Sequence, residues 1–436
     1  MLRLSGLVWI VCLESLLIAN SCHADPWPNW RGPLNNGICA EKNLPITWDG
    51  KQNIAWKLPL PGPAGATPVV WNDRVFLTSV DNDGQLLLMA VGADGKPVWD
   101  RVVSEGNRNV RGDEGNSASP SPVTDGLHVW TFFSNGILAC YTLDGDEVWK
   151  FDVQERYGKL NIQFGMTSSP VVDQGVLYQQ LIHGDGNSKT REAVVFALEA
   201  ATGKELWKVD RPSDAHSENE HSYASAILYD DGQRRFLLSH GADFVVAHSL
   251  KDGSELWRCG ELNKKSNYDR TLRFVASPAT ANGIIVVPSA KKGPIIALKP
   301  DGSGDVTEDA AAHWWTSPRT PDVPSPLIVG DLVYLCMENG DLAILRAKTG
   351  EQLDYQRTNR QRHRASPVYA DGHIYLTARD GTTTVVKASE KVQIVSENKL
   401  AENDLEEAMS ASPAFSNGTV YLRSFKHLWA IRRVTP

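Results

Sequence analysis

The chain has 436 residues and a formal net charge of −8, and 42% of its residues are hydrophobic while 22% are charged. This composition is typical of a protein that buries a large core, and it excludes a largely disordered chain. The basic residues form no cluster of the kind that neutralises phosphates, so the sequence predicts no nucleic-acid partner.

The first 24 residues have the pattern of a secretory signal peptide. Arg3 precedes an apolar stretch over residues 4–19, and the small residues Cys22 and Ala24 flank the expected cleavage site. The apolar stretch is shorter than the roughly 20 residues that span a bilayer, so a membrane anchor is less favoured. A lipoprotein acylated at Cys22 is also less favoured, because the preceding Ala-Asn-Ser fits a lipobox poorly. We expect a periplasmic or secreted protein with no transmembrane span after removal of the leader.

From residue 67 onward, one sequence unit recurs at intervals of roughly 50 residues, a period that is typical of propeller blades. Each unit begins with Ser-Pro or a variant of it and continues through short alternating strands and a Gly-containing turn. The units begin at Thr67, Ser121, Ser169, Ser225, Ser277, Ser325, Ser366 and Ser412. This repetition predicts an all-β protein built from four-stranded antiparallel sheets.

Most units end in a turn and an outer strand that carries a tryptophan. The first four endings are DGKPVW, DGDEVW, TGKELW and DGSELW; the fifth is stretched, the sixth has Tyr355 instead of tryptophan, and the seventh has no aromatic residue there. A tryptophan at this position offers a large apolar area and an N–H group to the neighbouring blade. The residues with this predicted docking role are Trp56, Trp99, Trp149, Trp207, Trp257 and Trp315.

The last unit, which begins at Ser412, ends after about three strands and lacks its closing segment. The missing strand is present near the N-terminus, because residues 53–60, NIAWKLPL, match the segment around Trp207 when Trp56 is aligned with it. We therefore predict an eight-bladed β-propeller in which this N-terminal strand completes the last blade and leaves no open sheet edge. Residues 25–436 would form a single domain.

Beyond the leader, the cysteines are Cys39, Cys140, Cys259 and Cys336, which are widely separated and contain no CxxC pair. Two disulfides could form in an oxidising compartment. However, four thiols in so long a chain do not indicate a fold that is held together by disulfides. Cys140 and Cys336 lie within apolar strand patterns, so we expect both to be buried as small hydrophobic residues.

The repeated ALxxxTGxxxW-like pattern resembles the pyrroloquinoline-quinone (PQQ)-like propeller repeat. That repeat occurs in quinoprotein alcohol and glucose dehydrogenases and in the BamB-type outer-membrane assembly factor. The segment WPNWRGPLNNG at residues 27–37 and the following LPITWDGKQNIAWKLPLPG look in particular like an exported branch that is abundant in planctomycete-type bacteria. The resemblance is specific for architecture, but fold alone does not determine activity.

A resemblance that extended to dehydrogenase chemistry would imply PQQ on an aromatic floor, with Ca²⁺ bound by Glu, Asn and Asp side chains. Such dehydrogenases often carry two adjacent cysteines over the cofactor, and this sequence has none. It also lacks a CxxCH motif for c-type haem. A PQQ- and Ca²⁺-dependent dehydrogenase of alcohols or sugars is therefore the alternative hypothesis. We favour a protein that binds no cofactor.

Several loops that precede the first strand of a blade are unusually polar, at residues 106–119, 161–168, 216–225, 267–277 and 357–366. These loops would line one mouth of the central channel, and loops carry binding residues more often than strands do. The candidate residues for an anionic or polyhydroxyl ligand are Arg111, Asp113, Glu114, Asn116, His221, Tyr223, Arg273 and Arg364. Alternatively, these loops are polar simply because they are solvated.

The sequence contains no HExxH metal motif, P-loop or GxSxG elbow, so it predicts no metal site and no familiar catalytic centre. The favoured hypothesis is a non-catalytic exported scaffold that binds an envelope protein, a peptide or a glycan through its loop face. A carbohydrate-binding module that works beside secreted hydrolases is a third hypothesis.

Overall fold

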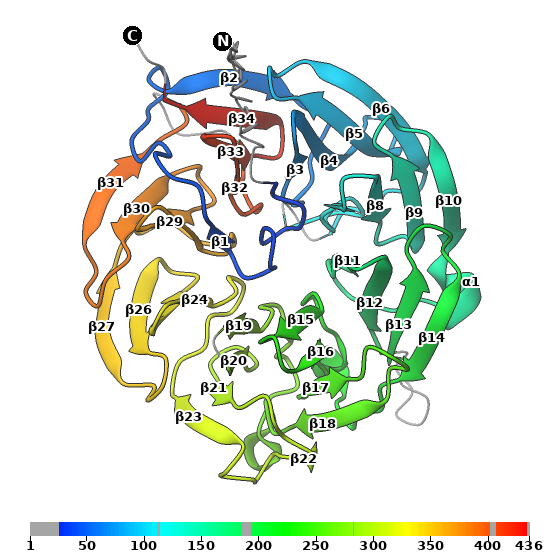
Figure 1. Ribbon diagram of the computed structural model, residues 1–436, viewed down its shortest axis with the longest axis vertical. Helices are drawn as coiled ribbons and strands as arrows, with labels where there is room; N and C mark the ends of the chain where they lie inside the picture. Colours follow the sequence, from blue (N-terminus) through cyan, green and yellow to red (C-terminus); the bar gives the residue numbers. More distant parts are fainter. Residues whose placement is uncertain (1–25, 111–113, 185–192, 282, 402–406, 434–436) are drawn as a thin grey trace, which may run out of the picture.

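The computed structural model describes residues 26–110, 114–184, 193–281, 283–401 and 407–433. Its strands form eight sheets arranged in a ring around a central axis (Figure 1). The leader expected at residues 1–24 lies outside the described residues. Within the described chain, no helix is long and apolar enough to cross a membrane.

The first four blades each contain four consecutive strands, from the innermost to the outermost. Blade 1 comprises β3 (Val69–Trp71), β4 (Arg74–Val80), β5 (Leu86–Gly92) and β6 (Pro97–Ser104). Blade 2 comprises β7 (Val123–Thr124), β8 (His128–Phe132), β9 (Ile137–Thr142) and β10 (Glu147–Asp152). Blade 3 comprises β11 (Val171–Asp173), β12 (Val176–Ile182), β13 (Ala193–Glu199) and β14 (Glu205–Asp210). Blade 4 comprises β15 (Ile227–Asp230), β16 (Arg235–Gly241), β17 (Phe244–His248) and β18 (Glu255–Cys259).

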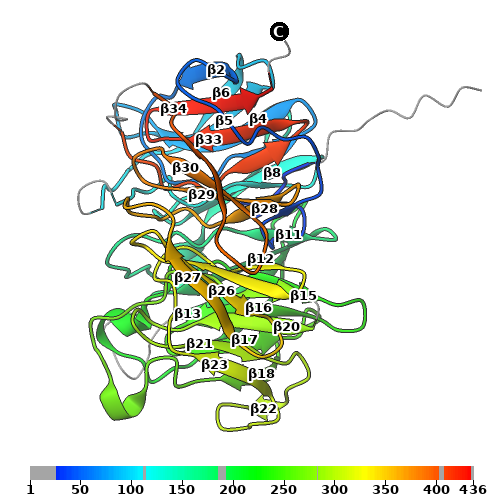
Figure 2. The ribbon, with the colours of Figure 1, turned by 90° about the vertical axis from the view of Figure 1, so that its left-hand side faces the viewer.

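The remaining blades follow the same plan. Blade 5 comprises β19 (Ala279–Ala281), β20 (Ile284–Pro288), β21 (Ile295–Leu298) and β23 (His313–Ser317). Blade 6 comprises β24 (Leu327–Val329), β25 (Leu332–Cys336), β26 (Asp341–Arg346) and β27 (Gln352–Arg357), and β27 lies in front of β26 in the side view of Figure 2. Blade 7 comprises β28 (Val368–Ala370), β29 (His373–Thr377), β30 (Thr383–Lys387) and β31 (Ile394–Asn398). Blade 8 comprises β32 (Ala414–Ser416), β33 (Thr419–Arg423), β34 (His427–Arg432) and the N-terminal β2 (Ile54–Pro59).

The N-terminal strand closes the ring as the sequence predicts. β2 pairs with β34 in antiparallel register, which places Trp56 opposite Ala430, just as Trp207 lies opposite Ala197 in blade 3. The last blade is therefore built from both ends of the chain, and the outer edge of β34 is covered.

The structure adds two short edge strands that the repeat does not predict. β1 (Ile38–Cys39) pairs in parallel with β28, and β22 (Gly304–Asp305) pairs in parallel with β18. The described helices are short and lie in connections: α1 (Val153–Tyr157), η1 (Ser217–Glu220) and η2 (Lys265–Asn267).

A closed circle of hydrogen bonds joins the starts of the eight blades. The backbone N–H of each unit's first residue donates to the hydroxyl of the corresponding residue in the next blade, at 2.9–3.0 Å, and Ser412 completes the circle by donating to Thr67. We call this circle the hydroxyl belt; it consists of Thr67, Ser121, Ser169, Ser225, Ser277, Ser325, Ser366 and Ser412. The belt explains why each unit needs a hydroxyl residue at its start.

Tryptophans on the outer strands bond to the neighbouring blade. The indole N–H groups of Trp56, Trp99, Trp149, Trp207 and Trp315 donate to the backbone oxygens of Ala93, Leu143, Ala200, Leu250 and Ala347, respectively, at 2.6–3.0 Å. Trp257 is buried more deeply than these tryptophans, but its N–H has no acceptor among the described residues. It packs instead against Gly302 in the stretched turn of blade 5.

Hydrophobic clusters fill the spaces between adjacent blades. One cluster, for example, joins Ala297 and Trp315 of blade 5 to Val333 and Leu345 of blade 6. Burial of these faces supplies the main driving force for closing the ring. All four cysteines of the described chain are buried and none is in a disulfide, which confirms the expectation for Cys140 and Cys336.

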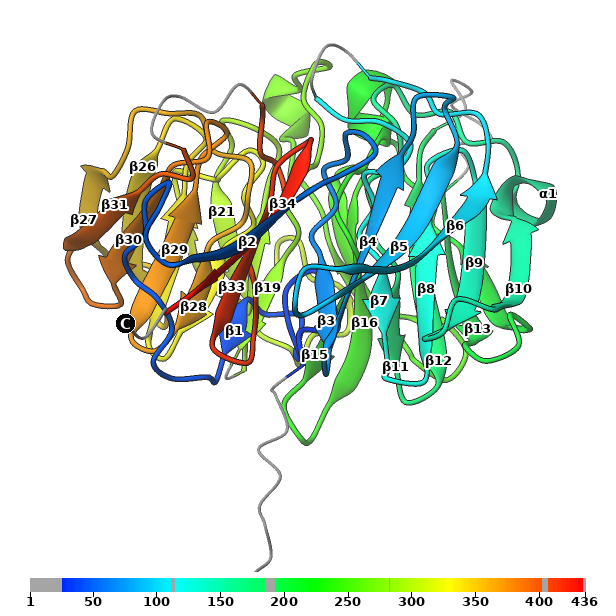
Figure 3. The same cartoon turned by 90° about the horizontal axis from the view of Figure 1, so that it is seen from above.

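The segment before β1 crosses the propeller axis. Trp27 pairs with Val70 of blade 1, the backbone oxygen of Pro28 accepts from Thr124 of blade 2, and Arg31 donates to Pro326 at the start of blade 6 at 2.6 Å. These contacts connect opposite sides of the ring. α1 lies in the connection between blades 2 and 3. In the edge-on view of Figure 3, α1 lies toward one face of the ring and β1 toward the other, so the crossing segment lies toward the face opposite the loops between blades.

Candidate binding site on the propeller axis

A cavity of about 270 Å³ lies on the axis, and all eight residues of the hydroxyl belt line it. Trp30 of the crossing segment lines it as well, together with side chains from the loops that connect one blade to the next. We call the face that carries these loops the inter-blade face. The repeat therefore builds the cavity directly, because each blade contributes its first residue and the loop before it.

The belt hydroxyls have an unused hydrogen-bonding capacity. Each hydroxyl accepts one backbone N–H from the preceding blade. A hydroxyl can both accept and donate, so each belt residue retains an O–H group. In the part of the chain that the structure describes, no protein acceptor for these O–H groups is found, and a bound molecule or water would have to supply one.

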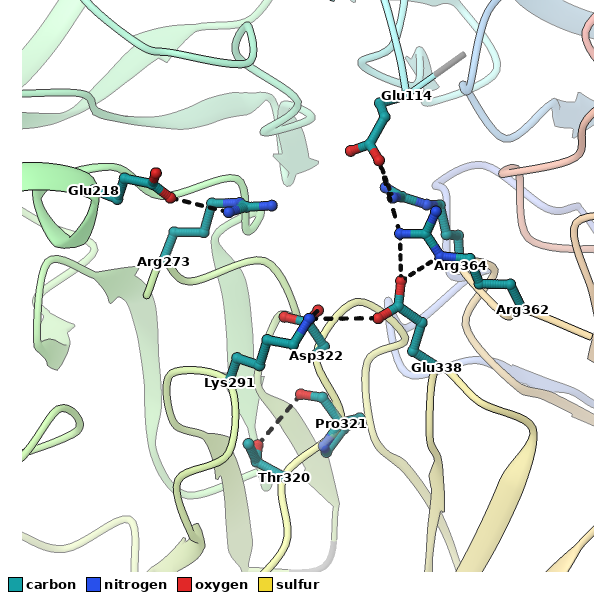
Figure 4. A network of polar contacts seen from close by, with 10 residues as sticks. All are labelled: Glu114, Glu218, Arg273, Lys291, Thr320, Pro321, Asp322, Glu338, Arg362 and Arg364. Atoms are coloured by element: carbon teal, nitrogen blue, oxygen red, sulfur yellow. Dashed lines mark hydrogen bonds and ion pairs between the residues drawn. The ribbon is translucent and has the colours of Figure 1, made fainter. Parts of the chain in front are cut away.

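Charged side chains form the wall of the cavity (Figure 4). Arg364 contacts Glu114 at 2.9 Å, and Arg362 contacts Glu338 at 2.7 Å. On the adjoining side Lys291 contacts Asp322 at 2.9 Å. The cavity lining thus holds three carboxylates, and each of them is in an ion pair.

Arg273 faces this network from the other side of the cavity in Figure 4. Its guanidinium contacts Glu218 at 3.0 Å and lies 4.7 Å from the centre of the Phe164 ring. Glu218 lies behind Arg273 and is not part of the lining. The four basic lining residues Arg273, Lys291, Arg362 and Arg364 exceed the three acidic ones by one charge.

Burial affects the basic and acidic sides of this network differently. It lowers the pKa of Arg364, whose side chain is 13% exposed. Burial also acts to raise the pKa of Glu338, but the Arg362 guanidinium and the Lys291 ammonium outweigh it and hold the pKa below its ordinary value. The Glu338 carboxylate is charged at neutral pH, and arginine keeps its charge in proteins, so the cavity presents fixed charges in a partly desolvated setting.

Three polar groups of the lining have no acceptor among the described residues. They are the Nε–H of Arg364, the indole N–H of Trp30 and the O–H of Tyr223, a residue that is 7% exposed. Burial raises the pKa of Tyr223, so its hydroxyl stays protonated and can donate. Unpaired buried donors are costly, which makes all three groups candidates for ligand contacts.

The structure brings together four of the eight residues that the sequence proposes for the channel mouth: Glu114, Tyr223, Arg273 and Arg364 all line the cavity. Asn116 does not line it, because its side chain holds the loop by donating to Pro63 at 2.6 Å and accepting from Ala118. His221 is buried behind the loop, where desolvation, His183 and Arg273 lower its pKa to about 4. Arg111 and Asp113 lie outside the described residues.

Sequence reasoning missed several lining residues. Lys291 follows β20, Asp322 follows β23, and Glu338 lies in the turn between β25 and β26. The repeat offered a signal for Lys291 and Glu338, because turns between the second and third strands reach the same face as the loops between blades. The unit-initial Ser and Thr residues were recognised as markers of the repeat but not as a lining.

A broader depression of about 600 Å³ adjoins the cavity and shares Lys291, Asp322, Glu338 and Arg362 with it. We call it the basic groove, because Lys291, Lys292, Arg319, Arg360 and Arg362 outnumber its acidic residues Asp322 and Glu338. The groove leads from the rim of the inter-blade face to the axis.

The donors of the cavity do not match what a Ca²⁺-dependent quinone site requires. Calcium is held by six to eight oxygen ligands that include carboxylates. Within the described residues, no group of three or more His, Cys, Asp or Glu side chains could hold a metal ion. The carboxylates of the cavity are paired with basic side chains instead.

Comparison of the sequence with known families identifies a family that matches most of the chain. Residues 41–178, 134–391 and 271–435 match the family described as outer membrane protein assembly factor BamB. Over 231 residues, the chain is 26% identical to outer membrane protein assembly factor BamB of Alkalilimnicola ehrlichii, a match that covers 52% of this chain and 51% of that protein. The chain thus matches about half the length of this curated relative.

Solved structures show the same fold. The crystal structure of BamB from Moraxella catarrhalis has a TM-score of 0.61 at 13% identity, over 87% of this chain and 97% of that one. The computationally designed Ika8 protein has a TM-score of 0.58 at 14% identity, over 86% and 99% of the two chains. At these identities the likeness concerns the architecture alone.

Proposed function

Because the chain belongs to the family of the outer membrane protein assembly factor BamB, we propose that it is a non-catalytic scaffold which binds an envelope protein through its inter-blade face. The leader pattern of residues 1–24 supports export to the periplasm or beyond. The names of its relatives support a protein partner rather than a small substrate.

The observation that carries the proposal is the basic groove and its continuity with the axial cavity. The local surplus of basic side chains in the groove is opposite in sign to the net charge of the whole chain, which is −8. Complementary charge increases the rate and selectivity of association. The groove thus favours a partner segment that carries acidic groups.

Charge reversal in the groove tests the proposal. The double variant Lys292→Glu/Arg360→Glu changes two exposed groove residues. The matched control Lys204→Glu/Lys251→Glu changes two exposed lysines in turns between third and fourth strands, on the opposite face. Immobilised wild type and the control should capture the same envelope proteins, quantified by mass spectrometry, and the groove variant should lose them. Equal capture by both variants would contradict the proposal.

A separate measurement addresses the dehydrogenase alternative. Purified protein mixed with PQQ and Ca²⁺ should show neither quinone absorbance nor dye reduction with a panel of alcohols and sugars. The reason is the donor set, since the cavity carboxylates are engaged with Arg362, Arg364 and Lys291. Substrate-dependent dye reduction would replace the scaffold proposal with the enzyme.

A further inference from the structure

We propose that the axial cavity is a receptor for a single carboxylate group, supplied either by the C-terminus of a peptide or by a small organic acid. This inference rests on the proposed function, because it specifies what the inter-blade face holds at its centre. It follows from which hydrogen-bonding groups of the cavity are already engaged and which are not.

The acceptors of the cavity are engaged. Glu114 is paired with Arg364, and Glu338 with both Arg362 and Lys291, as Figure 4 shows. Asp322 is paired with Lys291 as well. A ligand that offered mainly donors, such as an ammonium group, would have to displace one of these basic side chains.

The donors of the cavity are not all engaged. The belt hydroxyls retain their O–H groups, and the Arg364 Nε–H, the Trp30 indole N–H and the Tyr223 O–H have no acceptor among the described residues. Arg273 extends toward the same space from the other side. Donors that converge on one cavity from opposite sides require a ligand that carries acceptors, and a carboxylate provides two oxygens with about four acceptor sites.

The charge of the lining sets the charge of the ligand. Three of its four basic residues are paired with carboxylates of the lining, and the fourth, Arg273, is paired with Glu218 behind it, so the lining has no surplus charge to balance a dianion. A dianion such as phosphate would face repulsion from Glu114, Asp322 and Glu338, and this repulsion is strong because the side chains of these residues are mostly buried. The lining therefore favours a carboxylate over a phosphate.

The remaining lining residues favour an organic body behind the carboxylate. Trp30, Phe164 and the partly buried Val275 provide apolar surface beside the charged wall. The basic groove continues from the cavity to the rim, so a longer chain could leave the cavity along it. This continuity favours a peptide terminus as the source of the carboxylate.

Binding of matched probes tests the inference. Calorimetry on the full mature chain compares acetyl-Gly-Gly-Phe, which has a free carboxylate, with the same peptide amidated at its C-terminus. N-acetylphenylalanine serves as the free-acid arm. Both acids should bind and the amide should bind at least about tenfold more weakly, because hydrogen bonds to a charged group are the strong ones. Tighter binding of the peptide than of the free acid would assign the site to a peptide terminus, and equal binding would assign it to small acids.

Variants locate the binding. Arg364→Gln should weaken acid binding by about tenfold or more, and Tyr223→Phe by about threefold to tenfold with little effect on packing. Arg357→Gln is the matched control, since Arg357 is also paired with a carboxylate but does not line the cavity. Tyr223→Phe keeps the test decisive if Arg364→Gln fails to fold.

Equal binding of the acid and the amide would overturn the inference. So would the absence of binding of either acid at about 10 mM probe, because about 10 mM is the weakest affinity that a specific pocket of this kind should show. Neither result would affect capture of envelope proteins by the basic groove. Failure of the carboxylate site and failure of the scaffold proposal are therefore distinguishable.

Discussion

Two tryptophans in equivalent positions differ in one hydrogen bond. Trp207 and Trp257 both lie opposite an alanine of the third strand, Ala197 and Ala247, and both are at most 8% exposed. Trp207 donates to Leu250 at 3.0 Å, whereas the Trp257 N–H has no acceptor among the described residues. The two tryptophans also face different turns, because Gly302 of the stretched turn in blade 5 packs against the Trp257 indole.

Substitution by phenylalanine should separate the hydrogen bond from the packing. Trp207→Phe and Trp257→Phe remove the same atoms, but only the first breaks a hydrogen bond. We expect Trp207→Phe to lower the free energy of unfolding by about 1–2 kcal/mol more than Trp257→Phe, because it leaves the Leu250 oxygen unpaired. Urea unfolding of both variants measures this difference. Equal losses would mean that the indole N–H adds nothing to docking.

Asp243 gives the fold a pH dependence. It is 4% exposed, and burial raises its pKa to about 7 despite a hydrogen bond from Tyr268. The folded state therefore favours the protonated carboxyl, whose contribution to stability is complete below about pH 4 and is lost as the pH rises through about 7.

Asp243→Asn should remove this dependence. At pH 8 the variant should be more stable than wild type by on the order of 1–4 kcal/mol, because the wild type buries a charge there. Near pH 4 the two proteins should be similarly stable. Thermal unfolding from pH 4 to pH 8 measures the difference, and a wild type that gains stability relative to the variant on raising the pH would contradict the assignment.

At the scale of elements, the repeat predicts nearly all of the architecture. The Ser-Pro starts define the innermost strands, and the alignment of Trp56 with Trp207 identifies β2 as the last strand of blade 8. β1 and β22 escaped prediction, because two-residue parallel pairings depend on where the folded chain places a loop rather than on a local pattern. The path of the N-terminal segment across the axis was not predicted either, because it too depends on the folded chain rather than on a local pattern.

Replacement of β2 tests the closure of the ring. A variant with residues 54–59 exchanged for a Gly-Ser linker of equal length leaves β34 with an open edge. We expect a lower unfolding midpoint and aggregation, because the hydrophobic cluster against which Trp56 and Leu58 pack loses its cover. A synthetic peptide of residues 52–61 should restore the midpoint by adding a strand, whereas a scrambled peptide should not. An unchanged midpoint in the linker variant would show that the ring does not need this strand.

At the scale of the whole molecule, the sequence predicts where binding residues gather but not which of them meet. Arg364, Arg273 and Tyr223 were found because they lie in loops just before unit starts. Lys291 and Glu338 were missed because their turns lie within blades, and Asn116 was included because loop position alone cannot distinguish a lining residue from one that holds the loop. The basic groove could not be predicted from the net charge of −8, because this value sums the charges of both faces.

The groove and the net charge make opposite predictions for an acidic peptide. The probe acetyl-Glu-Glu-Gly-Gly-Phe adds two acidic residues upstream of the carboxylate. If the nearby groove charges dominate, the extension should tighten binding several-fold at 0.1 M salt, where charges interact over about 10 Å, and the gain should vanish at 1 M, where the range is about 3 Å. The side chains of Lys292 and Arg360 are exposed, so salt should screen them efficiently, while the buried pair of Arg364 and Glu114 should be screened less. Calorimetry of both peptides at the two salt concentrations measures these effects. If the net charge dominates instead, the extension should weaken binding at low salt, and the partner would have to be recognised by shape and the carboxylate alone.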